Sequence, residues 1–261
     1  MSLTLAQVRE RYDAQERQNV ADPNARREAF PNLVRYVAHG GDKSFVLYSK
    51  LDESTADTAI AEQVAYFGAL GLPFEWKLFS YDPPADLGAR LAAQGFELGD
   101  SEALLVLDTD TAPGILLDAP AGDLRPITTP AGIADVKVVE EAVWGDSYDR
   151  LDARFGLHLR DNTGYVAMYV AYVDDRPAAS AWMTFTPGSS FAYLWGGSTL
   201  AEYRGRGLYT DLLRVRLREA WRRNVRFLAV DASPMSRPIL KKYGFQLIGE
   251  AREANWRPKD G

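Results

Sequence analysis

The chain has 261 residues, which is enough for one large domain or two small ones. Its formal net charge of −6 at pH 7 argues against a general nucleic-acid-binding protein, so we expect no nucleic-acid partner. The absence of cysteine excludes disulfides, thiolate metal ligands and a cysteine nucleophile. With only 2 histidines a histidine metal cluster is excluded as well, and we expect no metal.

The N-terminal residues 1–18 are charged from the start and contain no apolar core, so we expect no secretory signal there. No apolar run approaches the roughly 18 residues that a membrane-spanning helix needs. These features predict a cytoplasmic protein without a membrane partner.

The pattern of residues 1–110 predicts one helix followed by strands and helices in alternation. The expected elements are a helix over 3–18, strands over 33–38 and 44–48 joined by a turn at 39–42, a helix opened by 52–55 and running to about 70, a strand over 74–79, a short helix over 85–94, and one or two strands between 96 and 107.

Residues 109–122 (TDTAPGILLDAPAG) are rich in Pro, Gly, Ala and Asp, which predicts a linker; we place it at 111–123, between domains 1–110 and 124–261. The expected elements of the second domain are a strand over 124–127, a helix over 129–143, a loop or broken helix over 144–162, strands over 165–173, 178–186 and 191–199, a helix over 208–224, a strand over 226–232, a short helix over 238–243 and a last strand over 245–249.

An internal repeat connects the two halves. Residues 90–98 (RLAAQGFEL) resemble residues 240–248 (LKKYGFQLI) around a shared Gly-Phe pair. The preceding elements also correspond: strand, long helix, strand and short helix occur in the same order in each half. We therefore predict two similar α/β domains.

The turn Arg204-Gly205-Arg206-Gly207 lies where a strand ends and the long helix of the second half begins. The first turn of a helix has backbone N–H groups without partners, and the helix dipole makes this end positive. Glycines allow close approach of an anion, and arginines add charge, so the turn predicts a phosphate site. The equivalent residues 50–54 (KLDES) are partly acidic and would repel phosphate, so the first half is expected to lack this site.

The segment 199–209 (TLAEYRGRGLY), the amphipathic helix after it, the strand ending in Asp231-Ala232-Ser233 and the segment 240–245 (LKKYGF) resemble the GNAT acetyltransferase superfamily. Its coenzyme A signature is Gln/Arg-x-x-Gly-x-Gly/Ala at the start of a helix. The sequence fits this signature except at Tyr209, where the family has Gly or Ala. The resemblance implies a tandem of two GNAT-like mixed-sheet domains, of which the first is degenerate and the second is complete with splayed central strands.

The resemblance also implies acetyl-CoA as co-substrate. Its pyrophosphate would lie on the turn and its pantetheine arm in the gap between the splayed strands, where it pairs like an added strand. Gly196 and Gly197 suit a bulge whose backbone N–H groups hold the thioester carbonyl. The cofactor-binding residues implied in this way are Thr199, Arg204, Gly205, Arg206, Gly207, Leu208, Tyr209 and Ser233.

The chemistry implied is direct attack of a primary amine on the thioester, with a base for the amine proton and an acid for the departing thiolate. The family's usual acid is a tyrosine at the position of Leu240, so Tyr243 is the candidate acid; packing at the helix end is the alternative. Asp231 is the candidate base, and a helix cap is its alternative. The acceptor is a small-molecule or peptide amine, and a homodimer is left open.

Two further expectations concern helix faces. Glu140 and Glu141 are assigned to a solvated face, and the row Arg214, Arg218 and Arg222 to another, with a contact to the 3′-phosphate of coenzyme A as its alternative. The loop 144–162 is expected to shape the acceptor site. Because Leu240 lacks a proton donor, a non-catalytic acyl-CoA-binding or scaffold protein is the alternative function.

Overall fold

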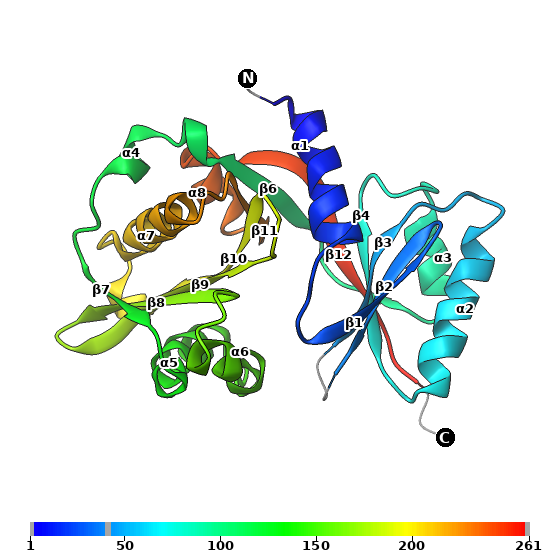
Figure 1. Ribbon diagram of the computed structural model, residues 1–261, viewed down its shortest axis with the longest axis horizontal. Helices are drawn as coiled ribbons and strands as arrows, with labels where there is room; N and C mark the ends of the chain where they lie inside the picture. The colour runs from blue at the N-terminus through cyan, green and yellow to red at the C-terminus, as the bar shows by residue number, and fades with distance from the viewer. Residues whose placement is uncertain (1–2, 40–42, 259–261) are drawn as a thin grey trace. The chain divides into compact units, whose positions relative to one another are not determined.

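The computed structural model describes residues 3–39 and 43–258 (Figure 1). Contacts between residues divide the chain into two compact units. The first unit is Met1–Leu105, Asp231–Pro238 and Leu247–Gly261, and the second is Val106–Val230 and Ile239–Gln246. These units do not coincide with the sequence boundaries at 110 and 124, because residues from the end of the chain pack with the first half.

The first unit contains a sheet in the order β1-β2-β3-β4-β12, with the short strand β5 also paired to β12. Residues 40–42 of the expected turn lie outside the described residues. The elements are α1 (Leu5–Tyr12), a π-helical turn (Asp13–Gln18), β1 (Ala25–Phe30), β2 (Leu33–Ala38), β3 (Ser44–Ser49), α2 (Ala56–Ala69), β4 (Phe74–Phe79), α3 (Leu87–Ala93), β5 (Glu97–Leu98), the start of β6 (Glu102–Asp108) and β12 (Gln246–Trp256).

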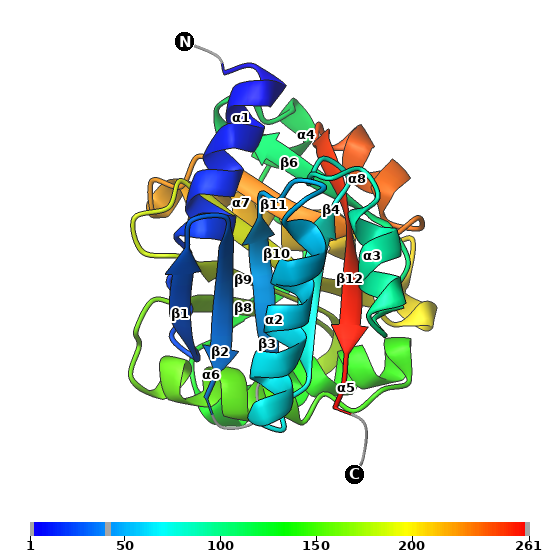
Figure 2. The ribbon, with the colours of Figure 1, turned by 90° about the vertical axis from the view of Figure 1, so that its right-hand side faces the viewer.

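The core of the first unit lies between this sheet and the helices α2 and α3, and Figure 2 shows α2 in front of the strands. The helix contributes Ile60 and Phe67, and β4 contributes Phe74 and Trp76 from alternate positions. Phe67 stacks on Phe74 with ring centroids 4.2 Å apart. Alternation along β4 leaves Glu75 and Lys77 on the opposite face of the sheet, as the two-residue period of a strand requires.

Two strands differ from the expectation. β1 was not expected, because Arg26, Arg27 and Glu28 make it polar; it lies at the sheet edge, where charged strands protect against unwanted pairing. β12 is longer than the strand expected over 245–249, because residues 251–256 pair antiparallel with β4. This pairing is the reason that the end of the chain belongs to the first unit.

The second unit contains strands in the order β11-β10-β9-β8-β7, with the end of β6 beside β11. The elements are the end of β6, a 3-10 turn (Thr109–Thr111), α4 (Gly114–Leu117), β7 (Asp123–Ile127), a 3-10 turn (Pro130–Gly132), α5 (Ile133–Trp144), α6 (Arg150–Arg160), β8 (Val166–Val173), β9 (Arg176–Phe185), β10 (Phe191–Thr199), a 3-10 turn (Ala201–Tyr203), α7 (Leu208–Arg222), β11 (Phe227–Ala232) and α8 (Arg237–Lys242).

Helices cover both faces of this second sheet (Figure 1). On one face, α5 and α6 bury Val136 and Phe155 against β8 and Trp182 of β9. On the other face, α7 buries Leu208 and Leu212 against the alanines of β9. The expected loop or broken helix over 144–162 is largely the helix α6.

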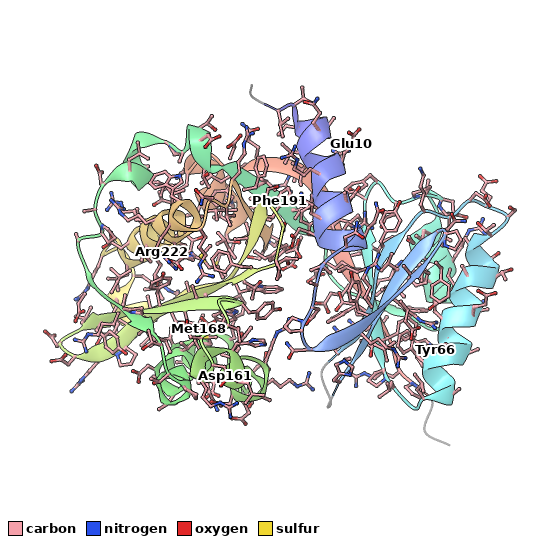
Figure 3. All side chains as sticks on the ribbon, viewed as in Figure 1. Glu10, Tyr66, Asp161, Met168, Phe191 and Arg222 are labelled. Atoms are coloured by element: carbon pink, nitrogen blue, oxygen red, sulfur yellow. The ribbon has the colours of Figure 1, made fainter. Side chains whose placement is uncertain are left out.

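Both units contain a pair of parallel strands that part after three residues. In the second unit, Phe191–Tyr193 of β10 pair with Phe227–Ala229 of β11, and Phe191 (labelled in Figure 3) stacks on Phe227. In the first unit, Ser44–Val46 of β3 pair with Phe74–Trp76 of β4. The predicted fold of two similar mixed-sheet domains with splayed strands in the second is therefore confirmed.

Candidate active site

The turn Arg204–Gly207 leads directly into the 15-residue helix α7, whose N-cap is Gly207. Gly205 and Gly207 have φ values of 75° and 83°, which favour glycine. The side of each glycine where a Cβ would stand has no atom within 4 Å, so the backbone here is open to a ligand. The first helical N–H groups face the same end of the helix, and two exposed arginines flank it, which suits a pyrophosphate.

Thr199 ends β10, just before this turn. Its Oγ1 is buried and has no hydrogen-bond partner among the described residues, while its carbonyl accepts a bond from Arg204 Nε at 3.2 Å. A buried hydroxyl without a partner is costly unless a ligand supplies one. This atom, together with the open backbone at Gly205 and Gly207, fits a bound acyl-CoA.

A bulge interrupts β10 at Gly197, four residues beyond Tyr193, the last residue of β10 that pairs with β11. The register against β9 shifts between Gly196 and Ser198, and φ is 65° at Gly196 and 87° at Gly197. A Cβ on Gly196 would clash with Trp182 at 2.7 Å, and one on Gly197 would lie 3.1 Å from the ring of Tyr209. The predicted bulge is therefore present, and side chains pack tightly against both of its glycines.

Glu140 of α5 lies beneath this bulge, and the expectation that it belongs to a solvated face is wrong. Its side chain is 0% exposed. The carboxylate accepts bonds from Ser180 Oγ at 2.6 Å, Ser198 Oγ at 2.7 Å and Trp144 Nε1 at 3.2 Å. Helical periodicity alone does not distinguish this glutamate from Glu141, because its partners lie on distant strands.

The Glu140 network extends to the surface through Trp144, the last residue of α5. Its indole Nε1 also donates to Ser198 Oγ at 3.0 Å, while 51% of the residue is exposed. The exposed ring is thereby held beside the residue that follows the bulge. That residues from 144 onward shape the acceptor site stays a prediction.

Burial raises the pKa of Glu140, and the three hydrogen bonds only partly oppose this effect. The folded state therefore holds this proton more tightly than the unfolded state, so stability falls as pH rises through the raised pKa. In Glu140→Gln this fall disappears. We expect the melting temperature of the wild type, relative to the variant, to decrease as pH rises above 4.5, the ordinary pKa of a glutamate. Glu141→Gln is the control, and a pH-independent difference for Glu140→Gln would contradict the assignment.

The candidate acid Tyr243 follows α8, and its hydroxyl lies 2.5 Å from Thr210 Oγ1 in the first turn of α7. Its ring centroid is 6.5 Å from that of Tyr209. Leu240, at the family's tyrosine position, is 2% exposed and belongs to the core. The structure therefore brings Tyr209, Thr210 and Tyr243 together at the start of α7.

The candidate base Asp231 and the candidate ligand Ser233 belong to the first compact unit, unlike the turn. Asp231 Oδ2 pairs with Lys77 Nζ at 2.8 Å, and its Oδ1 is buried without a hydrogen-bond partner among the described residues. Ser233 Oγ lies 3.2 Å from Ser236 Oγ. Catalysis by Asp231 stays a prediction.

The arginine row on α7 is not simply a solvated face. Arg214 donates to the carbonyl of Ile115 and pairs with Asp118 at 3.1 Å. Arg218 donates to the carbonyls of Leu117 and Asp118. These two arginines hold the segment 115–118, within the expected linker, against α7, whereas Arg222 pairs locally with Glu219.

In the first unit, the gap between the parting strands β3 and β4 is filled by the chain itself. Arg17, in the π-helical turn, donates from Nε to the carbonyl of Leu47 at 3.1 Å. Leu47 is the first residue of β3 beyond the parallel pairing with β4. Arg17 is 1% exposed and lies over Phe79 at the far end of β4. The backbone edge that an added strand would use is therefore occupied.

The position before α2 that corresponds to the phosphate-binding turn of the second unit is also filled. Before α2, the carboxylate of Asp52 accepts bonds from the backbone N–H groups of Ser54 and Thr55, each at 2.9 Å. Hydrogen bonds from these two residues lower the pKa of Asp52, so it is anionic at neutral pH. The chain's own carboxylate takes the place where a phosphate would bind.

These two observations predict the binding stoichiometry. We expect calorimetric titration with acetyl-CoA to give one site per chain, because Arg17 occupies the gap between β3 and β4 and Asp52 occupies the anion position before α2. A stoichiometry of two would contradict this conclusion. A matched measurement with Asp52→Gly tests whether the carboxylate alone excludes the second ligand.

Comparisons with known proteins agree with this geometry. Residues 133–245 match the model of the acetyltransferase (GNAT) family. A GCN5-related N-acetyltransferase from Kribbella flavida is similar over 100% of this chain and 98% of its own, with a TM-score of 0.71 and 14% identity. A functionally unknown conserved protein from Staphylococcus epidermidis is similar over 93% and 96%, with a TM-score of 0.65 and 14% identity. The sequence matches no curated protein.

The tandem arrangement has a counterpart among solved structures. A tandem GNAT protein from the clavulanic acid biosynthesis pathway covers 92% of this chain and 86% of its own, with a TM-score of 0.59 and 19% identity. At these identities the neighbours show the fold alone. Together with the match of residues 133–245 to the family model, they confirm the resemblance to the GNAT superfamily.

None of the helices in residues 3–39 and 43–258 is long and apolar enough to cross a membrane. Within the same residues, no group of histidine, aspartate and glutamate side chains has the arrangement of a metal site.

Proposed function

We propose that the protein is an acyl-CoA-dependent N-acetyltransferase that transfers the acetyl group of acetyl-CoA to a primary amine by direct attack. The observation that carries this proposal is the open glycine turn at the start of α7, next to strands β10 and β11 that part after three residues. Its position fits a phosphate group on the turn and an extended arm along the free edge of β10.

The residues of the second unit have distinct roles in this proposal. Arg204–Leu208 hold the pyrophosphate by backbone N–H groups and charge, and Thr199 Oγ1 gains a polar partner. The bulge at Gly196 and Gly197 presents backbone N–H groups to the thioester carbonyl, where they stabilise the oxyanion formed as the amine attacks. Trp144 faces the acceptor. Asp231 stays the base predicted from the sequence, and the acid is one of two neighbouring phenols at the start of α7: Tyr243, predicted from the sequence, or Tyr209.

Binding and turnover test the proposal separately. We expect isothermal titration to show acetyl-CoA binding, and thiol release from acetyl-CoA to accelerate with members of a panel of small amines and peptides. Absence of binding would contradict the proposal. Binding without turnover of any amine would favour the alternative, a non-catalytic acyl-CoA-binding protein, which the buried Leu240 supports. The cytoplasmic location and the homodimer also stay predictions.

A further inference from the structure

Tyr209 occupies the last place of the glycine signature, where the family has a small residue. Its Cε2 atom lies 3.1 Å from the position that a Cβ on Gly197 would take. The glycine in the bulge therefore makes room for the tyrosine ring, and no other residue fits at 197 without displacing it. The ring is placed against the strand position that the proposed function assigns to the thioester.

The ring of Tyr209 has two neighbours that bear on the reaction. It lies against Gly197 of the β10 bulge, and its centroid is 6.5 Å from that of Tyr243, which follows α8. The hydroxyl of Tyr209 forms no hydrogen bond within the described part of the chain, whereas that of Tyr243 is engaged with Thr210. Either hydroxyl can donate in the Thr210–Tyr243 bond, so of the two phenols Tyr209 is the one whose hydroxyl has no partner among the described residues.

The buried cation Arg216 lies near Tyr209. Arg216 lies two helical turns further along α7, on the same face, and is 2% exposed. Its Nε donates to the carbonyl of Leu212 at 2.9 Å, and one terminal nitrogen lies 3.8 Å from the Cβ position of Gly197. No carboxylate among the described residues lies within ion-pair distance of it, although Glu140 contributes a longer-range attraction.

The charge of Arg216 persists at neutral pH. Burial lowers the pKa of its guanidinium to about 10, which still leaves it protonated. A buried cation without an ion-pair partner is costly, and negative charge that develops beside it offsets this cost. Burial raises the pKa of Tyr209 and Arg216 opposes this rise, so the phenol keeps its proton while its phenolate is stabilised.

Resting on the proposed function, we propose that Tyr209 donates the proton that the departing coenzyme A sulfur takes up, and that Arg216 stabilises the negative charge at this point. When the carbon–sulfur bond of the tetrahedral intermediate breaks, its electron pair stays on sulfur. The sulfur–hydrogen bond forms as the Tyr209 oxygen–hydrogen bond breaks. The phenolate, beside Arg216, then regains a proton from water, and the attacking amine loses its proton separately to the base or to solvent.

The proton donor can be identified without knowledge of the acceptor. Coenzyme A itself is the probe, and the ultraviolet absorbance of its thiolate reports ionisation of the bound thiol. A phenol that donates to the thiolate lowers the thiol pKa relative to free coenzyme A. We expect Tyr209→Phe to raise the pKa of the bound thiol by about one unit, a tenfold change in ionisation. Tyr243→Phe is the matched control and should leave this pKa unchanged.

The test also requires that Tyr209→Phe folds normally and keeps its affinity for acetyl-CoA. Phenylalanine keeps the ring against Gly197, so thermal unfolding and the Kd for acetyl-CoA should match the wild type. With an acceptor that turns over, kcat should fall about 100-fold in Tyr209→Phe, as expected for loss of a general acid. The loss of activity at high pH that accompanies ionisation of the wild-type acid should be absent in this variant.

The outcomes are distinguishable. An unchanged thiol pKa in Tyr209→Phe overturns the proposal, and a raised one in Tyr243→Phe alone assigns the proton donor to Tyr243. Failure of the wild type to bind coenzyme A overturns the proposed function itself. If the wild type binds coenzyme A but the thiol pKa equals that of free coenzyme A, the proposed cofactor site holds and the proposed role of Tyr209 is wrong.

Discussion

Replacing Gly207 with glutamate is expected to weaken acetyl-CoA binding at least ~100-fold, equivalent to about 2.7 kcal/mol of binding free energy. The new carboxylate would stand at the N-terminus of α7, where the proposed pyrophosphate binds. Two like charges about 4 Å apart near a protein surface repel by roughly 4 kcal/mol, which exceeds the expected loss. The helix dipole would also be satisfied by the glutamate instead of the ligand.

The backbone at Gly207 complicates this experiment, because its φ of 83° strains any other residue. Gly188 provides a matched control: its φ is 77°, and no atom lies within 4 Å of its Cβ position. Gly188→Glu, in the turn between β9 and β10, carries the same charge and a similar strain of about 1–2 kcal/mol.

Calorimetry with acetyl-CoA and thermal unfolding of both glycine variants separate these effects. We expect similar losses of stability in Gly207→Glu and Gly188→Glu, with weakened binding in the first alone. Equal affinities for acetyl-CoA in the two variants would show that the turn does not hold the ligand.

The turn could be predicted from sequence because its information is local. Arg204–Gly207 are contiguous, and the strand before and the helix after are set by their own apolar periodicity. The splayed strands were implied by the resemblance to the GNAT superfamily, which rests on the same contiguous segment. The conformations of Gly205 and Gly207 in the structure are those that a glycine requirement at a helix start implies.

Glu140 and Arg17 could not be found in this way. Glu140 differs from Glu141 only in its contacts with Ser180 and Ser198, which the fold of the sheet brings to it. Arg17 lies in a charged helical segment, and the partners that bury it, Leu47 and Asp82, are separated from it by tens of residues. Local sequence shows that a residue is charged, but only tertiary packing decides whether that charge is buried.

The domain boundaries also depend on tertiary packing, which is why they differ from those expected from the sequence. The Gly-Phe repeat correctly indicates two similar halves, yet the strand that follows Phe245 pairs with β4 of the first half. Strand pairing joins residues far apart in sequence, and alternation within residues 250–256 fits any neighbouring edge. The repeat therefore describes the order of elements, whereas the partners of the last strand determine which residues pack together.

Replacing Arg17 with methionine is expected to destabilise the protein by about 3–5 kcal/mol, the largest effect on folding that we predict. Its guanidinium bonds both oxygens of Asp82, at 2.9 and 2.8 Å, and the side chains are only 1% and 3% exposed. Removal of the arginine leaves this carboxylate buried without its cation. It also frees the carbonyl of Leu47 in the gap between β3 and β4.

The pH dependence of the Arg17→Met effect follows from Asp82. Burial raises the pKa of Asp82 to about 6 even beside Arg17, and without the arginine this pKa rises further. A raised folded-state pKa means that stability is lost as pH rises through it, so the variant should be relatively less impaired at acidic pH.

Two further variants separate loss of the charge from loss of the contact. Arg17→Met combined with Asp82→Asn should recover part of the stability at neutral pH, because no uncompensated charge remains. Arg90→Met is the matched control, because Arg90 pairs with Asp57 and Asp86 at the surface and its loss should cost far less than the loss of Arg17. Urea denaturation of these variants measures each cost.

Equal costs for Arg17→Met and Arg90→Met would show that the Arg17 contacts do not hold the first unit together. Arg17→Met could instead raise the acetyl-CoA stoichiometry from one to two while the chain stays folded. That result would show that Arg17 blocks ligand binding in the gap between β3 and β4 as well as stabilising the first unit. Because Asp52 still occupies the anion position of that unit, we expect the stoichiometry to stay at one. The side chain at 17 is therefore expected to affect stability, and the carboxylate at 52 to limit binding.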